Sequence, residues 1–284
     1  MQNSVRRLGG RANDHLRSLK VSYNVFGAKA GSVLFELGNT KVLCSVTMQP
    51  GVPHFLKGTG TGWLTAEYAM LPTATAVRTQ RESSAAKQNG RSVEISRLIG
   101  RALRSIIALD KLGERTLLID CDVLQADGGT RTACITGAYF ALEDAMKYWL
   151  STKQLQQSIL KDSIVAVSAG ILQGHPILDL DYSEDSVIEA DFNFVLTRSN
   201  ALIEVQGTAE QQPVSWEHFD QLRLLAISGA EQLFAFFDAQ QPSMTFVPSK
   251  VADDAVPPIV IGHKSEQKKQ RDGTPMFSLA NRTV

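Results

Sequence analysis

Residues Asp120-Cys-Asp-Val-Leu-Gln-Ala-Asp-Gly-Gly-Thr-Arg-Thr-Ala133 join a strand pattern to a helix pattern through two glycines. Apolar and polar side chains alternate before the glycines, and a long amphipathic pattern follows them. Gly128 and Gly129 lie at the junction, where the lack of a Cβ lets backbone amides converge beside the unpaired donors of a helix start. Thr130 and Arg131 add a hydroxyl and a guanidinium. The stretch predicts a phosphate site, although an ordinary strand-to-helix turn explains this motif at least as well when it stands alone.

The composition is that of a globular chain with a sizeable core. The 284 residues are 43% hydrophobic and 20% charged, which predicts one domain, or one domain with an appendage. No unbroken apolar stretch is long enough to span a bilayer, and the N-terminus lacks the apolar centre of a secretory signal, so we expect a cytoplasmic protein without a membrane partner. Cys44, Cys121 and Cys134 lie in apolar patterns, which favours reduced core thiols over a disulfide or a zinc site.

Apolar periodicity divides most of the chain into hairpins and helices. Two strands, Ser32–Leu37 and Thr40–Met48, flank a Gly38-Asn39 turn. The elements expected after them are a helix over 92–112, a strand over 115–123, a helix over 131–150, paired strands over 164–172 and 177–182, paired strands over 190–198 and 201–206, and a helix over 215–239. Hairpins mixed with helices predict an α+β or mixed α/β fold over residues 1–240.

Two segments lack clear periodicity. Residues 49–90 hold few periodic apolar positions, and we favour a functional loop over a set of irregular strands, because long structureless loops are otherwise uncommon in compact domains. Residues 241–284 hold five prolines and a lysine-rich run, which predicts a flexible or surface-draped C-terminal extension. An arm that contacts another subunit or guides RNA is the alternative.

Formal charge is balanced, but its distribution is uneven. The chain carries 29 Lys and Arg residues against 29 Asp and Glu residues, which by itself argues against a nucleic-acid binder. Residues 1–30 and 73–104 are nevertheless basic, and local positive fields suit a polyanionic substrate. The basic residues of the first segment are Arg6, Arg7, Arg11, Arg17, Lys20 and Lys29. In the second segment, Arg97, Arg101 and Arg104 recur at helical spacing and can equally form a solvated helix face.

A second charged cluster is acidic. Six carboxylates crowd into 13 positions, namely Asp179, Asp181, Glu184, Asp185, Glu189 and Asp191. If this segment were one straight strand, Asp185 and Asp191 would lie ~20 Å apart and could not serve one site. Either the chain bends between them, or the cluster is only a solvated acidic edge, which the residues alone favour.

Seven blocks of this sequence, in order and spacing, resemble the ribonuclease PH family of bacterial phosphorolytic 3′→5′ exoribonucleases. Besides the opening motif, the blocks are Gly31–Cys44, Val52–Gly58, Gly62–Pro72, Gly90–Arg104, Glu184–Ser186 with Asp191, and Ile203–Glu210. A single Gly-Gly-Thr-Arg is a weak signal, whereas seven ordered blocks between residues 9 and 240 are specific. The resemblance implies the ribonuclease PH-like fold, built on a β-α-β-α core.

The resemblance also implies roles for single residues. Arg91 and the triplet 129–131 would hold the attacking inorganic phosphate through a guanidinium pair, a hydroxyl and backbone amides. Asp185 and Asp191 would be the catalytic acidic pair, which turns the preference towards a bent chain. They would bind Mg²⁺, or one of them would protonate the leaving 3′-oxygen. The sequence leaves both roles open.

In the reaction that the resemblance implies, inorganic phosphate attacks the last phosphodiester of an RNA 3′ end and releases a nucleoside diphosphate. The reverse reaction would extend RNA, and positioning of two anions would supply most of the rate. The family implies tRNA precursors as substrates and a homo-oligomer, specifically a hexameric ring. A non-catalytic RNA-binding ring subunit of an RNA-degrading assembly is the alternative, and a hydrolytic nuclease is a further one.

RNA itself would be held by a separate set of residues. We assign this role to Arg78, Arg81 and the N-terminal basic residues, with Phe55 as a stacking platform. Two departures from the family pattern, Thr73 and His54 where arginine is usual, remove fixed positive charge near this path. We therefore expect altered RNA affinity or subunit contacts rather than an inactive enzyme.

Overall fold

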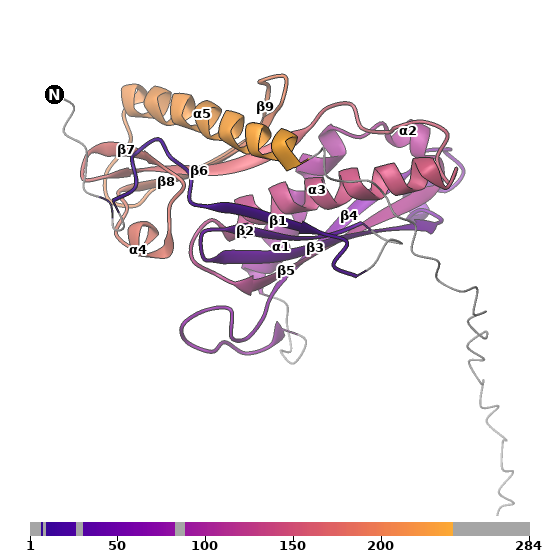
Figure 1. Ribbon diagram of the computed structural model, residues 1–284, viewed down its shortest axis with the longest axis horizontal. Helices are drawn as coiled ribbons and strands as arrows, with labels where there is room; N and C mark the ends of the chain where they lie inside the picture. The colour runs from indigo at the N-terminus through magenta and orange to yellow at the C-terminus, as the bar shows by residue number, and fades with distance from the viewer. Residues whose placement is uncertain (1–6, 8–9, 27–30, 83–88, 241–284) are drawn as a thin grey trace, which may run out of the picture. The chain divides into compact units, whose positions relative to one another are not determined.

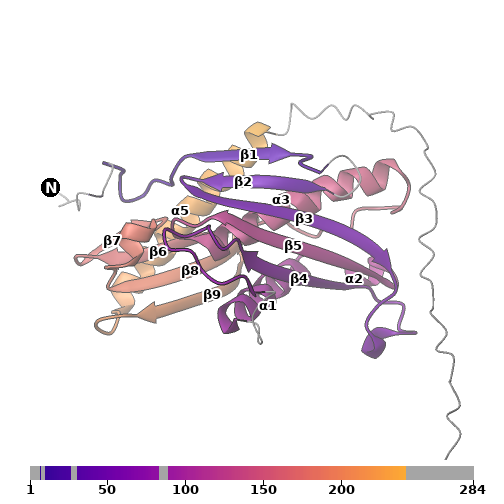
Figure 2. The same cartoon turned by 90° about the horizontal axis from the view of Figure 1, so that it is seen from below.

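The computed structural model describes residues 7, 10–26, 31–82 and 89–240. Over this part of the chain it is an α+β protein, as predicted, and it contains two sheets and five helices (Figures 1 and 2). The elements in chain order are β1 (Leu19–Tyr23), β2 (Ser32–Leu37), β3 (Thr40–Pro50), the 3₁₀ turn η1 (His54–Leu56), β4 (Trp63–Met70), α1 (Gly90–Ser105), α2 (Leu109–Leu112), β5 (Arg115–Gln125), α3 (Thr130–Ser151), β6 (Ile164–Leu172), β7 (His175–Leu178), α4 (Tyr182–Asp185), β8 (Ala190–Thr197), β9 (Leu202–Ala209) and α5 (Trp216–Gln240). The predicted extension over 241–284 lies outside the described residues.

The first sheet has the strand order β1-β2-β3-β5-β4 (Figure 2). The predicted hairpin is present, with Leu37 opposite Thr40 across the Gly38-Asn39 turn. β3 runs antiparallel to β5, whereas β4 runs parallel to β5. β1, which the sequence pattern did not predict, adds an edge strand antiparallel to β2.

The second sheet has the order β7-β6-β8-β9, and all of its strands are antiparallel. Helix α3 packs against β2 and β3 of the first sheet and against β6 of the second, so it lies between the sheets (Figure 1). A helix in that place must be apolar nearly all round, because both sides face core. Most α3 residues are accordingly buried, and the predicted amphipathic character is wrong for that reason.

Aromatic side chains join the layers around α3. Phe140 of α3 meets Phe35 of β2 edge-on, with 5.6 Å between ring centroids. Its other side stacks on Phe237 of α5 at 4.5 Å. Each such pair adds roughly 0.5–1.5 kcal/mol beyond the area it buries. The first sheet, α3 and α5 therefore share one core.

Two sequence-based boundaries are wrong. The segment 49–90, predicted as a functional loop, contains strand β4, because parallel pairing with β5 gives this stretch a complete ladder on one edge. The predicted helix 92–112 ends at Ser105, and a separate turn, α2, follows. Between them the Ala108 amide donates to the carbonyl oxygen of Ile159, a contact outside the helix that breaks the helical ladder.

The hairpin predicted over 164–182 is also shorter than expected. β7 ends at Leu178 because Asp179 adopts a left-handed φ of 56°, which no strand continues. The next residues form the short helix α4 instead of a strand. The three cysteines are free and buried, as predicted. None of the helices in the described part of the chain is long and apolar enough to cross a membrane.

Two helical glycines give a matched test of this packing. A Cβ on Gly137 of α3 would lie 2.9 Å from Cys44 Sγ and 3.2 Å from Phe35 Cβ, both fixed in the first sheet. We expect Gly137→Ala to lower the free energy of unfolding by about 1–3 kcal/mol, since overpacking outweighs the gain in helix propensity. Urea denaturation measures this change.

Gly100→Ala in α1 is the control. Its Cβ would lie 2.9 Å from Arg104 Nη1, the far end of a flexible side chain, and 3.9 Å from the Ala66 backbone nitrogen, which is ordinary van der Waals contact. This variant should match or exceed wild-type stability, by up to about 1 kcal/mol. Equal effects of the two substitutions would contradict the close packing of α3 on the sheet.

Candidate active site

The Gly128-Gly129 junction has the backbone that its sequence predicts. Gly128 has a φ of 76° and Gly129 a φ of 65°, both in the left-handed region that favours glycine. A Cβ on Gly128 would also lie 2.5 Å from the carbonyl oxygen of Leu180. The junction therefore requires glycine for its conformation and for its close approach to the segment that carries the acidic residues.

The carbonyl groups of the junction are held inside the protein. Gly128 O accepts a hydrogen bond from Thr40 Oγ1 at 2.7 Å, and Gly129 O accepts one from Thr132 Oγ1 at 2.9 Å. The amides of Gly129 and Thr130 lie at the N-terminus of helix α3 and have no acceptor among the described residues. Unpaired amides at a helix start can bind an anion, and phosphate binding at this junction stays a prediction.

Tyr68 is a member of this site that sequence reasoning missed. Its hydroxyl donates a 3.1 Å hydrogen bond to Thr130 Oγ1, and both side chains are buried. Burial raises the pKa of Tyr68 to about 12, so the phenol keeps its proton. The Thr130 hydroxyl, accepting from Tyr68, keeps its own proton for another acceptor. The alternation of Leu64, Ala66 and Tyr68 with polar neighbours is the period-two signal that would have revealed this strand.

The chain bends between Asp185 and Asp191. Asp185 ends helix α4, and Asp191 is the second residue of β8. A capping box begins the helix, and in it the Asp181 carboxylate accepts hydrogen bonds from the Ser183 and Glu184 amides. A straight strand through this segment, with ~20 Å between the two carboxylates, is therefore excluded.

Most of the other acidic side chains of the cluster have structural partners. Glu184 accepts two 2.7 Å hydrogen bonds from the Arg7 guanidinium, and both side chains are almost fully buried. Asp179, also buried, pairs with Arg17 at 2.8 Å and with Arg11 at 3.3 Å. The solvated-edge interpretation is therefore wrong for these two carboxylates.

Asp185 and Asp191 share one electrostatic environment with two arginines. Burial and, second, the nearby Asp185 carboxylate raise the pKa of Asp191 to about 6, against the opposing effect of Arg131. Burial also raises the pKa of Asp185, against Arg91 and Arg131, although exposure of this side chain limits the shift. The structure thus brings together four of the residues predicted for phosphate binding and catalysis.

The two arginines come from different helix starts. Arg91 is exposed in the first turn of α1, where the Asn89 side chain caps its amide. Arg131, one-fifth exposed, donates to Gln206 Oε1 at 3.2 Å and lies 3.7 Å from Glu94. Both guanidinium groups keep donors available for an oxyanion.

The residues predicted to bind RNA are scattered. Arg78 and Arg81 are exposed in the segment that follows β4, and their role stays a prediction. Burial raises the pKa of Asp122 and Arg81 opposes that shift, so the Arg81 charge lies near the end of β5. Thr73 is exposed in the same segment.

Phe55 is not brought to this site. It is exposed and packs edge-on against Trp63, with 5.3 Å between ring centroids. Trp63 begins β4, five residues before the Tyr68 that contacts Thr130, which is about 17 Å of extended strand. Phe55 therefore lies at the opposite end of the first sheet from the glycine junction of the same chain.

The N-terminal basic residues that the structure describes are paired with acidic side chains. Arg7, Arg11 and Arg17 form ion pairs with the buried carboxylates of Asp179 and Glu184. These pairs give the three arginines a structural role, and RNA binding by them stays a prediction. Lys20 is exposed and pairs with Glu36 at 3.2 Å. Arg6 and Lys29 lie outside the described residues.

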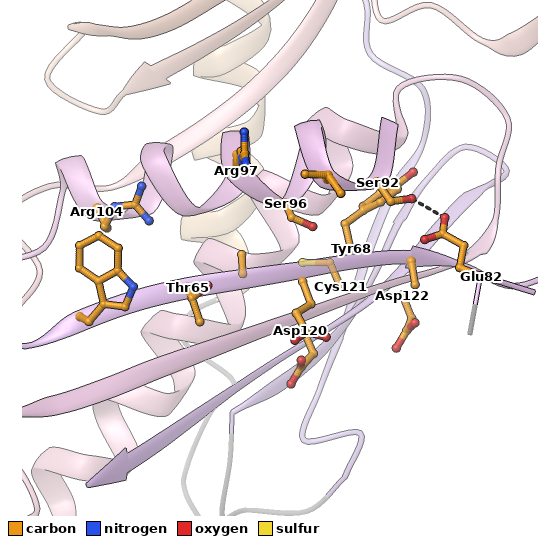
Figure 3. A pocket seen from close by; sticks show the side chains of 15 residues that line it. Thr65, Tyr68, Glu82, Ser92, Ser96, Arg97, Arg104, Asp120, Cys121 and Asp122 are labelled. Atoms are coloured by element: carbon orange, nitrogen blue, oxygen red, sulfur yellow. Dashed lines mark hydrogen bonds between the residues drawn. The ribbon is translucent and has the colours of Figure 1, made fainter. Parts of the chain in front are cut away.

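The basic face of α1 is partly tied to its neighbours. Arg101 pairs with Glu204 at 2.6 Å. Arg104 lies over the Trp63 ring, 4.7 Å from its centroid. Arg97 lines a cavity of about 610 Å³ between α1 and β4 (Figure 3). This cavity shares Tyr68 with the phosphate site but does not include the acidic pair.

Comparisons with known proteins agree with this geometry. The family model described as 3′ exoribonuclease family, domain 1, matches residues 15–147, and the model for domain 2 of the same family matches residues 162–229. Fold and site together define a protein of the 3′ exoribonuclease class. The chain belongs to the ribonuclease PH family.

Solved structures with the same fold include chains of two exosome structures and rice Rrp46. A chain of the Archaeoglobus fulgidus exosome with RNA bound to the active site is 24% identical, with a TM-score of 0.69, over 81% of this chain and 92% of that one. Rice (Oryza sativa) Rrp46 is 19% identical, with a TM-score of 0.67, over 82% and 98% of the two chains. A chain of an archaeal exosome core is 23% identical, with a TM-score of 0.65, over 82% and 91%. At these identities the likeness establishes the fold.

The raised pKa of Asp191 predicts a specific pH dependence of stability. The folded-state pKa of about 6 exceeds the usual value of about 3.9, so the folded protein binds the extra proton between these two pH values. Wild-type stability should therefore fall relative to Asp191→Asn as pH rises from about 4 to 6, and the difference should stay constant above that. Denaturant unfolding in metal-free and phosphate-free buffer measures it.

The exposed surface residue Asp220 supplies the control. Asp220→Asn should change stability little and without a step near pH 6. A pH-independent difference between wild type and Asp191→Asn would show that the Asp191 carboxyl titrates normally.

Proposed function

We propose that this protein is a phosphate-dependent 3′→5′ exoribonuclease that removes 3′-terminal nucleotides from RNA as nucleoside diphosphates. The observation that carries this proposal is the convergence of two opposite kinds of group. Arg91, Arg131 and the unpaired amides of α3 form a cradle for an anion, and the carboxylates of Asp185 and Asp191 lie within electrostatic reach of its arginines. Membership of the 3′ exoribonuclease family supports the same reaction.

The chemistry requires two negatively charged groups to meet. Attacking phosphate would be held by both guanidinium groups, by the amides of Gly129 and Thr130, and by the Thr130 hydroxyl. Bond formation between a phosphate oxygen and the scissile phosphorus releases the RNA 3′-oxygen, which takes up a proton. Because one phosphate linkage replaces another, the reaction would run in both directions, and nucleoside diphosphates would extend an RNA 3′ end.

The acidic pair fits Mg²⁺. Magnesium is commonly held by one or two carboxylates together with water and substrate phosphate oxygens. In the described part of the chain, no cluster of three or more His, Cys, Asp or Glu side chains is arranged to hold a metal, so the two aspartates and the substrate would share the ligand shell. A bound Mg²⁺ would supply charge neutralisation of the scissile phosphate. The raised pKa of Asp191 also suits a proton donor to the leaving oxygen.

The proposed partners follow from the same reading. RNA 3′ ends, with tRNA precursors as the substrate class, would approach over Arg78 and Arg81. The Archaeoglobus fulgidus exosome structure, whose active site binds RNA, supports an RNA substrate for this fold. Likeness to exosome core chains also supports assembly into a ring, which we propose is a homohexamer.

The products of digestion test the proposed function. An RNA with a 3′ extension should be shortened only when inorganic phosphate is present, and the products should be nucleoside diphosphates. Chromatography of the products with ³²P-labelled phosphate measures both properties. Nucleoside monophosphates released without phosphate would identify a hydrolytic nuclease, and RNA binding without any turnover would identify a non-catalytic ring subunit.

The acidic pair should act in both directions of the reaction. We expect Asp185→Asn to lower phosphorolysis and diphosphate-driven RNA extension by the same factor, on the order of 100-fold or more, because both directions share one transition state. RNA affinity, measured by fluorescence anisotropy, should be retained, since the substitution removes a negative charge beside a polyanion.

Glu189→Gln is the matched control from the same segment. Within the described part of the chain, the Glu189 carboxylate accepts one hydrogen bond, from the Gly174 amide at 3.1 Å, and glutamine can keep that bond. Its rates should equal those of wild type. A loss in one direction only, or an equal loss in the control, would contradict the role given to Asp185.

A further inference from the structure

Arg17 contacts the glycine junction from the side opposite the free amides. This residue lies two positions before the start of β1, and its side chain is 8% exposed. Nη1 donates to the carbonyl oxygen of Asp127, and Nη2 donates to that of Gly128 at 3.3 Å. A Cβ on Gly129 would lie 3.1 Å from Arg17 Nη2, so the guanidinium fills the space beneath the junction.

Asp179 fixes this guanidinium from behind. Its carboxylate accepts Arg17 Nε at 2.9 Å and Nη2 at 2.8 Å, and it also accepts the Arg17 amide at 2.7 Å. The carboxylate is 2% exposed. Such a two-pronged pair sets the plane of a guanidinium as well as its position. The remaining donors of Arg17 therefore point in one fixed direction, towards the junction.

The hydrogen bonds to the carbonyl oxygens of Asp127 and Gly128 also orient the backbone amides that follow them. In a trans peptide the C=O and the following N–H point in opposite directions. Gly128 O is held by Arg17 and by Thr40, so the Gly129 amide must point away from both. Asp127 O is held by Arg17, which sets the Gly128 amide in the same way.

We propose that Arg17 is a positioning residue for the phosphate site, acting through the junction carbonyls and not through contact with RNA or phosphate. This inference rests on the proposed function. The Arg17 charge is balanced by Asp179, so its contribution is direction rather than positive field. A lysine would keep the charge and lose the fork, because its single ammonium cannot bind Asp179 and both carbonyl oxygens in one plane.

Arg17→Lys tests the proposal in the full chain. We expect the KM for inorganic phosphate to rise by about 10-fold or more, since at least one charge-assisted hydrogen bond to the junction is lost. The KM for RNA and the kcat at saturating phosphate should stay within about 3-fold of wild type, since the lost contacts touch only the phosphate loop. Steady-state phosphorolysis at varied phosphate and varied RNA measures the three parameters.

A matched control is available on another arginine fork. Arg198 binds Asp238 with two 2.9 Å hydrogen bonds, and it follows the end of β8 opposite to Asp191. Arg198→Lys breaks a fork of the same kind about 23 Å of strand away from Asp191. Its KM for phosphate should equal that of wild type.

A second variant keeps the proposal testable if Arg17→Lys folds poorly. Thr40 Oγ1 donates to Gly128 O at 2.7 Å and accepts the Asp127 amide at 3.0 Å. Thr40→Val removes this second hold on the same peptide and keeps the shape of the side chain. The KM for phosphate should rise by about 5-fold, the equivalent of one neutral hydrogen bond, again without a matching change for RNA.

The stabilisation of the protein by inorganic phosphate separates the possible outcomes. If the wild type gains no Tm from millimolar phosphate and shows no phosphorolysis, the proposed function itself fails. If phosphate stabilises the wild type and Arg17→Lys keeps the wild-type KM for phosphate, the charge of residue 17 is sufficient and the positioning role is refuted. Equal loss of every kinetic parameter, together with a lower Tm, would also overturn it and leave Arg17 a purely structural residue. A selective rise in the phosphate KM with a smaller phosphate-induced Tm shift supports it.

Discussion

Two buried carboxylates and the three arginines that neutralise them hold the candidate site in place. Asp179 and Glu184 are each 2% exposed, and isolated charges at that depth would be strongly destabilising. Removing one partner of such a pair typically costs 3–5 kcal/mol. The pairs link the N-terminal segment to the chain just before Asp185 and, through Arg17, to the glycine junction. Both halves of the site therefore depend on the same buried network.

Local chemistry made the backbone of the candidate phosphate site predictable. The glycines at 128 and 129 need left-handed φ values, and the threonine and arginine that follow begin a helix, so sequence and geometry agree at short range. The hairpin with the Gly38-Asn39 turn is local in the same sense. The bend that brings Asp185 near Asp191 was predicted only from the resemblance to the family, because the residues that cause the bend lie outside the segment between the two aspartates. These include the left-handed Asp179 and the capped helix α4.

Long-range pairing explains what the sequence did not reveal. The N-terminal arginines look like a basic patch until their partners, more than 160 residues away, are known. Tyr68 reaches Thr130 because β4 pairs with β5. The alternation of apolar and polar residues is the one signal of this strand in segment 49–90. Phe55, predicted as a stacking platform for RNA, lies at the other end of the sheet, where Trp63 begins β4.

The parallel pairing of β4 and β5 has a topological consequence. Both strands run in the same direction, so the chain must cross back between them, and it does so through the segment with Arg78 and Arg81 and through α1. Parallel strands also end at the same edge of the sheet, where α/β folds commonly place their ligands. The start of the crossover, the Arg91 that opens its helix and the turn after β5 therefore meet at one rim. One connection between two neighbouring strands thus gathers cationic groups from three separate stretches of chain, and the core residues of α1 fix how that connection crosses the sheet.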